Sequence, residues 1–309
     1  MSKMIPTTSR AWEPILKRQP SGVSDVALTF DDGPFPNSTP YILKELDKFK
    51  AKATFFLSGV RLKKNLVLAA DIVAAGHMVF GHGWEHVRVD RMNAEQVLAT
   101  LLRIEELLVR LRPIPATYLL RFPYNSGIGS IAAHMAAARF HPDARFAWWS
   151  ITTGDWALMD RCRDDQVLNA RCQALCDRIG ANPTLAGSII LLHDSPFDVT
   201  HPLRDRVGEI LLPMLLTRLR DRHLQAGPLR TPPRDERFIR WRAIEPRLAV
   251  HHALTQARRV LPGQRRDSAA TVPGSLPPRR SGLDVTETEE RGAALTSVSP
   301  PRPPRPGHA

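Results

Sequence analysis

Short apolar runs alternate with longer amphipathic segments from Val26 to about Leu229. The runs are bounded by Gly, Pro or Asp, as is typical of strands, whereas apolar residues in the segments between them recur at helical spacing. The pattern predicts strands at 26–30, 53–57, 77–81, 117–120, 146–151, 188–192 and 223–226. It predicts helices at 40–49, 66–75, 94–111, 130–139, 165–179 and 203–222. Ser38 or Thr39 is placed to cap the first of these helices, with Pro40 in its first turn.

This alternation of strand and helix is typical of parallel α/β folds. Several runs are apolar throughout, as expected for strands whose two faces are both covered by helices. Two architectures fit the pattern, a parallel barrel and an open doubly wound sheet. Seven strands fit a distorted, incomplete parallel (β/α) barrel better than a regular eightfold barrel.

Composition divides the chain into four parts. Residues 1–24 are a polar lead-in, and residues 25–228 form the α/β domain. Residues 229–261 are an extension in which a helix is expected at 236–260, broken at Pro246. Thirteen of the 27 prolines lie beyond Gly227. We predict that the Pro- and Arg-rich residues 262–309 are disordered, because they cannot pack as a regular element.

The formal net charge is +12, and residues 226–309 hold 15 arginines against 8 acidic residues, a net of +7. A general arginine bias explains this excess, so we expect no specific nucleic-acid partner and at most a weak contact of the tail with anionic surfaces.

Three cysteines form no paired framework. Neither a secretory apolar core nor an apolar run of spanning length is present, so we expect a cytoplasmic protein without a transmembrane segment, with export by another route left open.

Polar clusters follow five of the predicted strands. They are Asp31-Asp32, the pair His82 and His86, Arg121 to Tyr124, Asp155-Trp156, and His193. Because the carboxyl ends of parallel strands share one rim, we expect these clusters to meet there. Two adjacent carboxylates repel each other, and a cation bound to one of them would separate their roles. One carboxylate and two imidazoles are a ligand set typical of catalytic metal sites.

In the same order, these segments match the five motifs of the polysaccharide deacetylases. The motifs are Thr29-Phe30-Asp31-Asp32-Gly33, His82-x-x-x-His86, Arg121-x-Pro123-Tyr124, Asp155-Trp156 and Leu191-Leu192-His193. Residues 25 to 226 therefore resemble the NodB-homology domain of carbohydrate esterases that deacetylate chitin, chitooligosaccharides, peptidoglycan or acetylxylan. The resemblance implies a distorted (β/α) barrel. It also implies a metal-dependent hydrolase of carbon–nitrogen bonds other than peptide bonds, which removes acetyl groups from N-acetylated sugars of a polysaccharide or oligosaccharide.

The resemblance also implies a metal site and a base. Asp32, His82 and His86 would hold a divalent cation, with zinc as the first choice and cobalt or nickel as alternatives. Asp31 would be the general base that activates water. Arg121 beside it would fix its geometry and favour its charged form.

The remaining motif residues would complete the reaction. The backbone N–H of Tyr124 would help to stabilise the oxyanion. His193 would protonate the departing amine, with its imidazolium supported by Asp155. The substrate groove would be lined by Trp84, Trp156 and Leu191.

Three positions depart from the family pattern. Gly83 stands where Ser or Thr is usual, Thr152 stands where many relatives have a further aspartate, and Phe122 is bulkier than the usual residue. None of them removes a ligand, base or acid, so they bear on the substrate. The alternative function within this fold is hydrolysis of a small-molecule amide, ester or imide. A scaffold or polyanion-binding protein that works through its tail is a third hypothesis.

Overall fold

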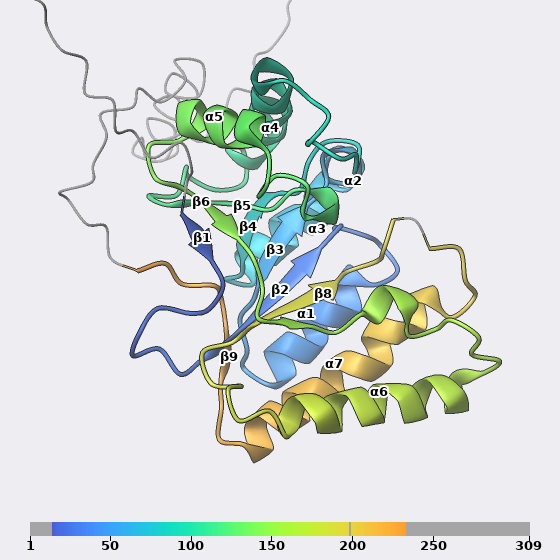
Figure 1. The fold of residues 1–309 in the computed structure, drawn as a ribbon. Coiled ribbons are helices and arrows are strands. Elements are labelled where there is room, and N and C mark those ends of the chain that lie inside the picture. The colour runs from blue at the N-terminus through green and yellow to red at the C-terminus, as the bar shows by residue number, and fades with distance from the viewer. Residues whose placement is uncertain (1–13, 198, 233–309) are drawn as a thin grey trace, which may run out of the picture. The chain divides into compact units, whose positions relative to one another are not determined.

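Two parallel sheets form the centre of the protein, which a computed structural model describes for residues 14–197 and 199–232 (Figure 1). The larger sheet has six strands, in the order β4 (Met78–Gly81), β3 (Thr54–Leu57), β2 (Val26–Asp31), β8 (Ile189–His193) and β7 (Ile151–Thr152), with β9 (Ala226–Gly227) also paired to β2. The smaller sheet has the order β1 (Ile15–Leu16), β6 (Ala144–Ala147) and β5 (Tyr118–Leu120). Every pairing between these strands is parallel.

The predicted fold class, a parallel α/β fold with an incomplete barrel, is confirmed. In the described residues the strand pairings leave the barrel open, because none of them joins the two sheets. The segment predicted as one strand, 146–151, contains parts of two strands, β6 in the smaller sheet and β7 in the larger sheet. Trp148 donates its backbone N–H to Leu16 of the smaller sheet, and Ser150 donates to Ile189 of the larger one, at 2.8 and 3.0 Å. The chain thus passes from one sheet to the other within three residues.

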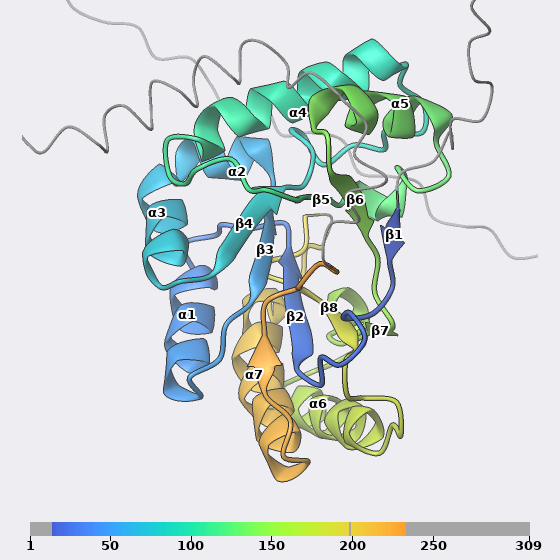
Figure 2. The same cartoon turned by 90° about the vertical axis from the view of Figure 1, so that its left-hand side faces the viewer.

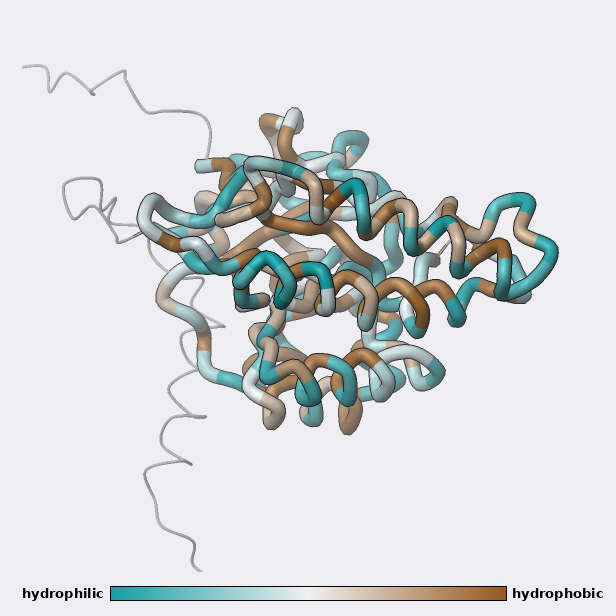
Figure 3. The backbone as a smooth tube through the Cα atoms, turned by 90° about the horizontal axis from the view of Figure 1, so that it is seen from below, coloured by the Kyte–Doolittle hydropathy of each residue, from teal (hydrophilic) through white to brown (hydrophobic). Residues whose placement is uncertain are grey.

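Helices cover the sheets in two groups (Figures 1 and 2). The larger sheet shares its hydrophobic cluster with α1 (Thr39–Lys48), α3 (Leu66–Ala74), α6 (Asp165–Gly180) and α7 (Arg204–Asp221). The smaller sheet shares a second cluster with α4 (Ala94–Leu108) and α5 (Ile131–Phe140). Brown and teal turns alternate along the helices in Figure 3, as expected when one helix face is buried and the other is solvated. All six residues of β2 and all four of β3 are buried, which explains their apolar runs.

Several elements differ from the sequence prediction. Strand β1 lies within the segment predicted to be a mere lead-in, and the short helix α2 (Gly59–Lys64) was not predicted. Ser38 occupies the N-cap position of α1 and Pro40 lies in its first turn, as predicted, but the Ser38 side chain makes no capping hydrogen bond. The hydroxyls of Ser38 and Thr39 donate instead to the buried carboxylate of Asp194. Asp194 also packs so closely on Gly33 that a Cβ there would lie 2.3 Å from its Oδ2, which explains the glycine.

A buried ion pair ties α4 to the smaller sheet. Arg112 donates to both carboxylate oxygens of Glu105, at 2.8 and 3.1 Å, and to the carbonyl oxygen of Val79 at 2.9 Å. The hydroxyl of Tyr118, on β5, donates to the same carboxylate. All the polar groups of this cluster are therefore paired, as a buried network requires.

Replacing Glu105 with glutamine is expected to lower the free energy of unfolding by about 3–5 kcal/mol, because the charge of Arg112 stays buried without its counterion. Urea unfolding of the variant and the wild type measures this difference. Glu106→Gln, at the exposed neighbouring position, is the control and should change stability by less than about 0.5 kcal/mol. Equal effects of the two substitutions would contradict a stabilising role for the buried pair.

The three cysteines, Cys162, Cys172 and Cys176, are buried free thiols, in line with the absence of a disulfide framework. Burial raises the pKa of the Cys172 and Cys176 thiols to about 12, so they stay protonated.

None of the helices in the described ranges has the length and hydropathy of a membrane span. The predictions for residues 233–261, for the tail 262–309 and for most of the lead-in lie outside the described residues.

Candidate active site

All five polar clusters contribute side chains to one cavity of about 550 Å³ at the carboxyl ends of the strands, but Asp155-Trp156 does so only through Trp156, and Arg121 to Tyr124 only through Phe122 and Tyr124. The strand register explains part of this convergence. Asp31 and His193, which are 162 positions apart in the chain, are direct partners across the neighbouring parallel strands β2 and β8. The cavity is lined by Asp31, Asp32, His82, His86, Phe122, Tyr124, Asn125, Trp148, Trp149, Trp156, Leu191, His193, Pro196, Phe197 and Val199.

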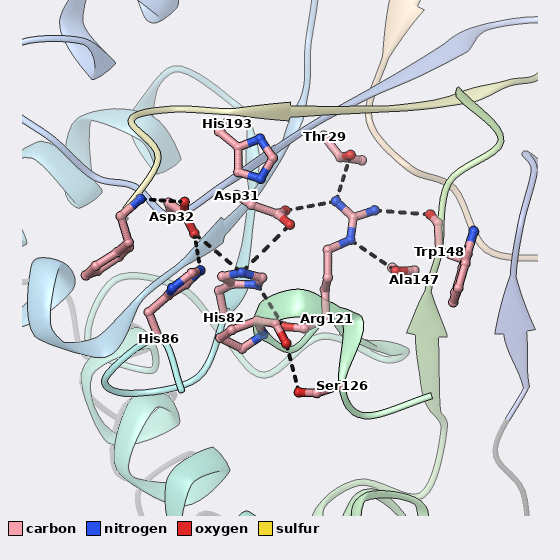
Figure 4. Close-up of polar contacts among 12 residues, drawn as sticks. Thr29, Asp31, Asp32, His82, His86, Arg121, Ser126, Ala147, Trp148 and His193 are labelled. Atoms are coloured by element: carbon pink, nitrogen blue, oxygen red, sulfur yellow. Dashed lines mark hydrogen bonds and ion pairs between the residues drawn. The ribbon is translucent and has the colours of Figure 1, made fainter. Parts of the chain in front are cut away.

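Three side chains form a cluster with the spacing of metal ligands (Figure 4). Oδ1 of Asp32 lies 3.1 Å from Nε2 of His86 and 3.5 Å from Nε2 of His82, and one ligand atom from each residue lies within 4.8 Å of the others. Asp32 and His82 are buried. Apart from the two imidazoles, no donor approaches the buried Oδ1 of Asp32, which is costly unless a positive charge faces it. These residues therefore fit a cation.

The protonation of this cluster also suits a cation. Burial alone raises the pKa of Asp32, but the hydrogen bond from His86 and the charge of His193 outweigh it and lower that pKa to about 2. Burial lowers the pKa of His82 despite its two aspartate neighbours. Its Nδ1 lies 3.0 Å from the carbonyl oxygen of Arg121, which can only accept, so Nδ1 carries the proton and Nε2 offers a lone pair toward Asp32.

Asp31 is held by Arg121 rather than by the histidines. Arg121 Nη1 donates to Asp31 Oδ1 at 2.9 Å and to the hydroxyl of Thr29 at 2.8 Å. Its other nitrogens donate to the carbonyl oxygens of Ala147 and Trp148 at 3.0 and 3.1 Å. All three nitrogens of the guanidinium thus donate hydrogen bonds. The second oxygen of Asp31, 3.8 Å from His82 Nε2, faces the cluster (Figure 4).

His193 is oriented by Asp155, which lies in the 3-10 turn η2 (Asp155–Ala157). Oδ1 of Asp155 lies 2.8 Å from Nδ1 of His193, and Oδ2 accepts the backbone N–H of His193 at 2.6 Å. Burial disfavours the imidazolium, but the charge and hydrogen bond of Asp155, with the charges of Asp32 and Asp31, raise the pKa of His193 to about 9. His193 is therefore protonated at neutral pH and can donate a proton into the cavity.

The predicted substrate-contacting residues separate into two groups. Trp156 and Leu191 line the cavity, and residue Trp156 is 40% exposed. Trp84 does not line it. Trp84 is buried in the core of the larger sheet, packs on Gly59 and is covered by the guanidinium of Arg103 at 3.6 Å. We do not retain Trp84 as a substrate-contacting residue.

One departure from the family pattern, Gly83, acquires a local explanation. Gly83 has a φ of +73°, a conformation that side chains rarely adopt, and a Cβ there would lie 3.1 Å from Cδ of Pro123. A serine or threonine would therefore be strained at this position. Tyr124, in the turn η1 (Pro123–Asn125), also has a positive φ, of 54°, and is a half-exposed residue at the cavity wall. The role of its backbone N–H stays a prediction.

Sequence reasoning missed several cavity residues. Trp148 and Trp149 stack at 5.0 Å between β6 and β7 and line the cavity. Phe197 stacks on His86 at 4.6 Å, and its backbone N–H donates to Asp32 Oδ2 at 3.2 Å. The tandem tryptophans lay inside a predicted strand, where one of two adjacent side chains should face away, so the pattern gave no hint that both line one cavity.

The structure is therefore that of an α/β protein with a cluster of acidic residues, histidines and an arginine at its strand ends, and its sequence is similar to known proteins of one described family. The family model for polysaccharide deacetylase matches residues 18–140. A chitooligosaccharide deacetylase from Bradyrhizobium sp. (strain ANU 289) is 30% identical over 174 residues, which cover 56% of this chain and 72% of that protein. The chain belongs to the polysaccharide deacetylase family, which confirms the resemblance read from its motifs.

Two further proteins show how far the likeness extends. A peptidoglycan-N-acetylglucosamine deacetylase from Bacillus cereus is 29% identical over 177 residues, which are 57% of this chain and 58% of that protein. The chain therefore spans less than two thirds of this relative. The crystal structure of the Bc1960 peptidoglycan N-acetylglucosamine deacetylase, solved with 4-naphthalen-1-yl-N-oxidanyl-benzamide, is 26% identical with a TM-score of 0.55. The likeness covers 69% of this chain and 89% of that chain.

Proposed function

We propose that the protein is a metal-dependent hydrolase that removes acetyl groups from N-acetylated sugars of a polysaccharide or oligosaccharide. The observation that carries the proposal is the grouping of a three-residue ligand cluster, an arginine-paired carboxylate and an aspartate-paired histidine in one cavity. Relatives named as peptidoglycan and chitooligosaccharide deacetylases support the choice of substrate class.

Asp32, His82 and His86 would hold the cation, since one ligand atom from each of them lies within 4.8 Å of the others and Asp32 and His82 are buried. Three N/O ligands favour zinc, and cobalt or nickel suit the same set. Such a cation polarises a carbonyl group and makes bound water more acidic.

Asp31 would act as the general base. One of its oxygens is engaged by Arg121, and the other faces the ligand cluster, where it can accept a proton from the attacking water. The hydrogen bond from Arg121 at 2.9 Å fixes the orientation of this carboxylate. This division explains why two adjacent aspartates can have different roles.

His193 would donate the second proton, to the nitrogen of the departing amine. Its Nδ1 is occupied by Asp155, so Nε2 is the atom that delivers the proton. The backbone N–H of Tyr124, at the wall of the same cavity, would stabilise the oxyanion. Trp156 and Leu191 would contact the sugar, joined by the tandem tryptophans Trp148 and Trp149.

A specific observation supports the alternative, hydrolysis of a small-molecule amide, ester or imide. Apart from the proposed catalytic and metal-binding groups, the cavity wall is mainly aromatic or aliphatic, and Asn125 is its one side-chain amide. A sugar needs partners for its hydroxyl groups, whereas a compact apolar amide needs few. Assaying small aryl acetamides beside acetylated oligosaccharides distinguishes the two substrates.

The purified protein is expected to release acetate from an N-acetylglucosamine oligomer, to lose this activity on chelation, and to regain it when zinc is added back. The reason is that the cation supplies both carbonyl polarisation and the activated water. Enzymatic detection of acetate beside metal analysis tests this, with His82→Ala as the control that should not be restored by zinc. A fully metallated protein that hydrolyses only the aryl acetamides would favour the alternative.

A further inference from the structure

An arginine outside the catalytic motifs contacts the loops that carry the proposed metal ligands. Arg61, on α2, donates from Nη1 to the backbone carbonyl oxygen of Asp32 at 3.2 Å. The same nitrogen donates to the carbonyl oxygen of Ser195, in the loop that follows β8. Arg61 thereby joins two loops that come from neighbouring strands of the sheet.

The guanidinium of Arg61 also begins a three-layer stack. Its Cζ lies 3.8 Å from the centroid of the Phe197 ring. That ring is parallel to the imidazole of His86, with centroids 4.6 Å apart and an angle of 4° between the planes. In addition, the backbone N–H of Phe197 donates to Asp32 Oδ2 at 3.2 Å. Phe197 therefore contacts two of the three proposed ligands, and Arg61 packs against Phe197.

We propose that Arg61 is a positioning residue for the metal site and acts through Phe197. The stack limits rotation of the His86 ring, and the Phe197 N–H occupies Oδ2 of Asp32, so that Oδ1 points to the histidines. Because Asp32 and His86 both have positive φ angles, of 76° and 51°, their conformations depend on such supporting contacts. The inference rests on the proposed metal site.

Whether metal binding becomes weaker or tighter when Arg61 is replaced distinguishes a positioning role from a purely electrostatic one. A positive charge near a cation site repels the cation, so charge alone predicts tighter metal binding when Arg61 is neutralised. Loss of positioning predicts weaker binding. Groups that orient metal ligands typically change metal affinity by about 10–100-fold when they are removed.

Arg61→Met is expected to weaken zinc binding by about 10–100-fold, measured as the zinc dissociation constant by competition with a chromogenic chelator. Arg61→Lys keeps the charge but lacks the planar fork, and should fall between wild type and Arg61→Met. Arg220→Met is the matched control, because this exposed arginine also lies over a ring, that of Phe49 at 5.5 Å, but touches no residue of the site. It should bind zinc as the wild type does.

A double-mutant cycle tests the route through Phe197. Phe197→Leu should weaken zinc binding too, and Arg61→Met added to it should have little further effect, because the two residues act as one unit. Additive effects would overturn the route, and unchanged or tighter zinc binding in both Arg61 variants would overturn the inference while leaving the metal site intact. A wild-type protein that binds no zinc would overturn both. If Arg61→Met does not fold, Arg61→Lys and Phe197→Leu carry the test.

Discussion

Replacing Asp31 with asparagine is expected to lower kcat for acetate release by about 10²–10⁴-fold, while the protein keeps its metal. Asparagine can still accept the hydrogen bond that Arg121 donates to Asp31 Oδ1 at 2.9 Å, so the local structure should persist. It cannot take a proton from water. Turnover measured at saturating substrate, beside metal analysis of the same sample, tests both parts of the expectation.

Asp32→Ala is the matched comparison, because it removes the neighbouring carboxylate. This variant should lose both metal and activity, since Asp32 Oδ1 lies closest to the two histidines and has no other donor. If the two variants retain equal amounts of metal, the division of roles between Asp31 and Asp32 is wrong. Loss of metal in Asp31→Asn alone would exchange the two roles.

The convergence of the site could be predicted because strand ends are visible in a sequence. The apolar run that ends at Asp31 and the one that ends at His193 form neighbouring strands in parallel register, so their terminal residues meet. Five polar clusters, each placed after an apolar run, therefore located the cavity before its geometry was known. The fold class followed from the same alternation.

The direction of a loop side chain could not be predicted in this way. Trp84 lies between His82 and His86 in the chain, yet it points into the core, where the lack of a side chain at Gly59 makes room for it. A Cβ on Gly59 would lie 2.3 Å from the Trp84 ring, so the two positions are coupled by a contact that spacing does not reveal. Sequence proximity to a ligand was therefore a poor guide to exposure.

Contacts between segments that carry no recognisable motif could not be predicted from the sequence either. Arg61 and Phe197 are 136 positions apart, and neither has a neighbour in the chain that suggests a metal site. The predicted strand 146–151 failed for a related reason. Phe146 lies in the smaller sheet, Ile151 lies in the larger sheet, and the two tryptophans between them line the cavity. A single apolar run does not show that its residues lie in three different environments.

Replacing His193 with alanine is expected to lower kcat on an N-acetylated sugar by about 10²–10⁴-fold, because the amine must then leave without a proton donor. An acetyl ester with an acidic phenol as leaving group needs no such proton. Its hydrolysis should fall far less, which makes it a control for folding and metal content. Equal losses on the two substrates would show that His193 does not act as the acid.

The pH dependence of activity is a second test of the proton that His193 donates. A protonated His193 is required, and its pKa is raised to about 9, mainly by Asp155 against the opposing effect of burial, so activity should decline only as pH rises toward 9. Asp155→Asn removes the charge that favours the imidazolium, and the alkaline limb of kcat/KM should move down toward the ordinary pKa of histidine, about 6.5. Stability follows the same sign. The raised pKa of His193 stabilises the folded wild type fully below about pH 6.5, and this contribution is lost as pH rises through 9. The wild type should therefore exceed Asp155→Asn in stability by more below pH 6.5 than above pH 9. An alkaline limb that does not move in Asp155→Asn would assign it to another group.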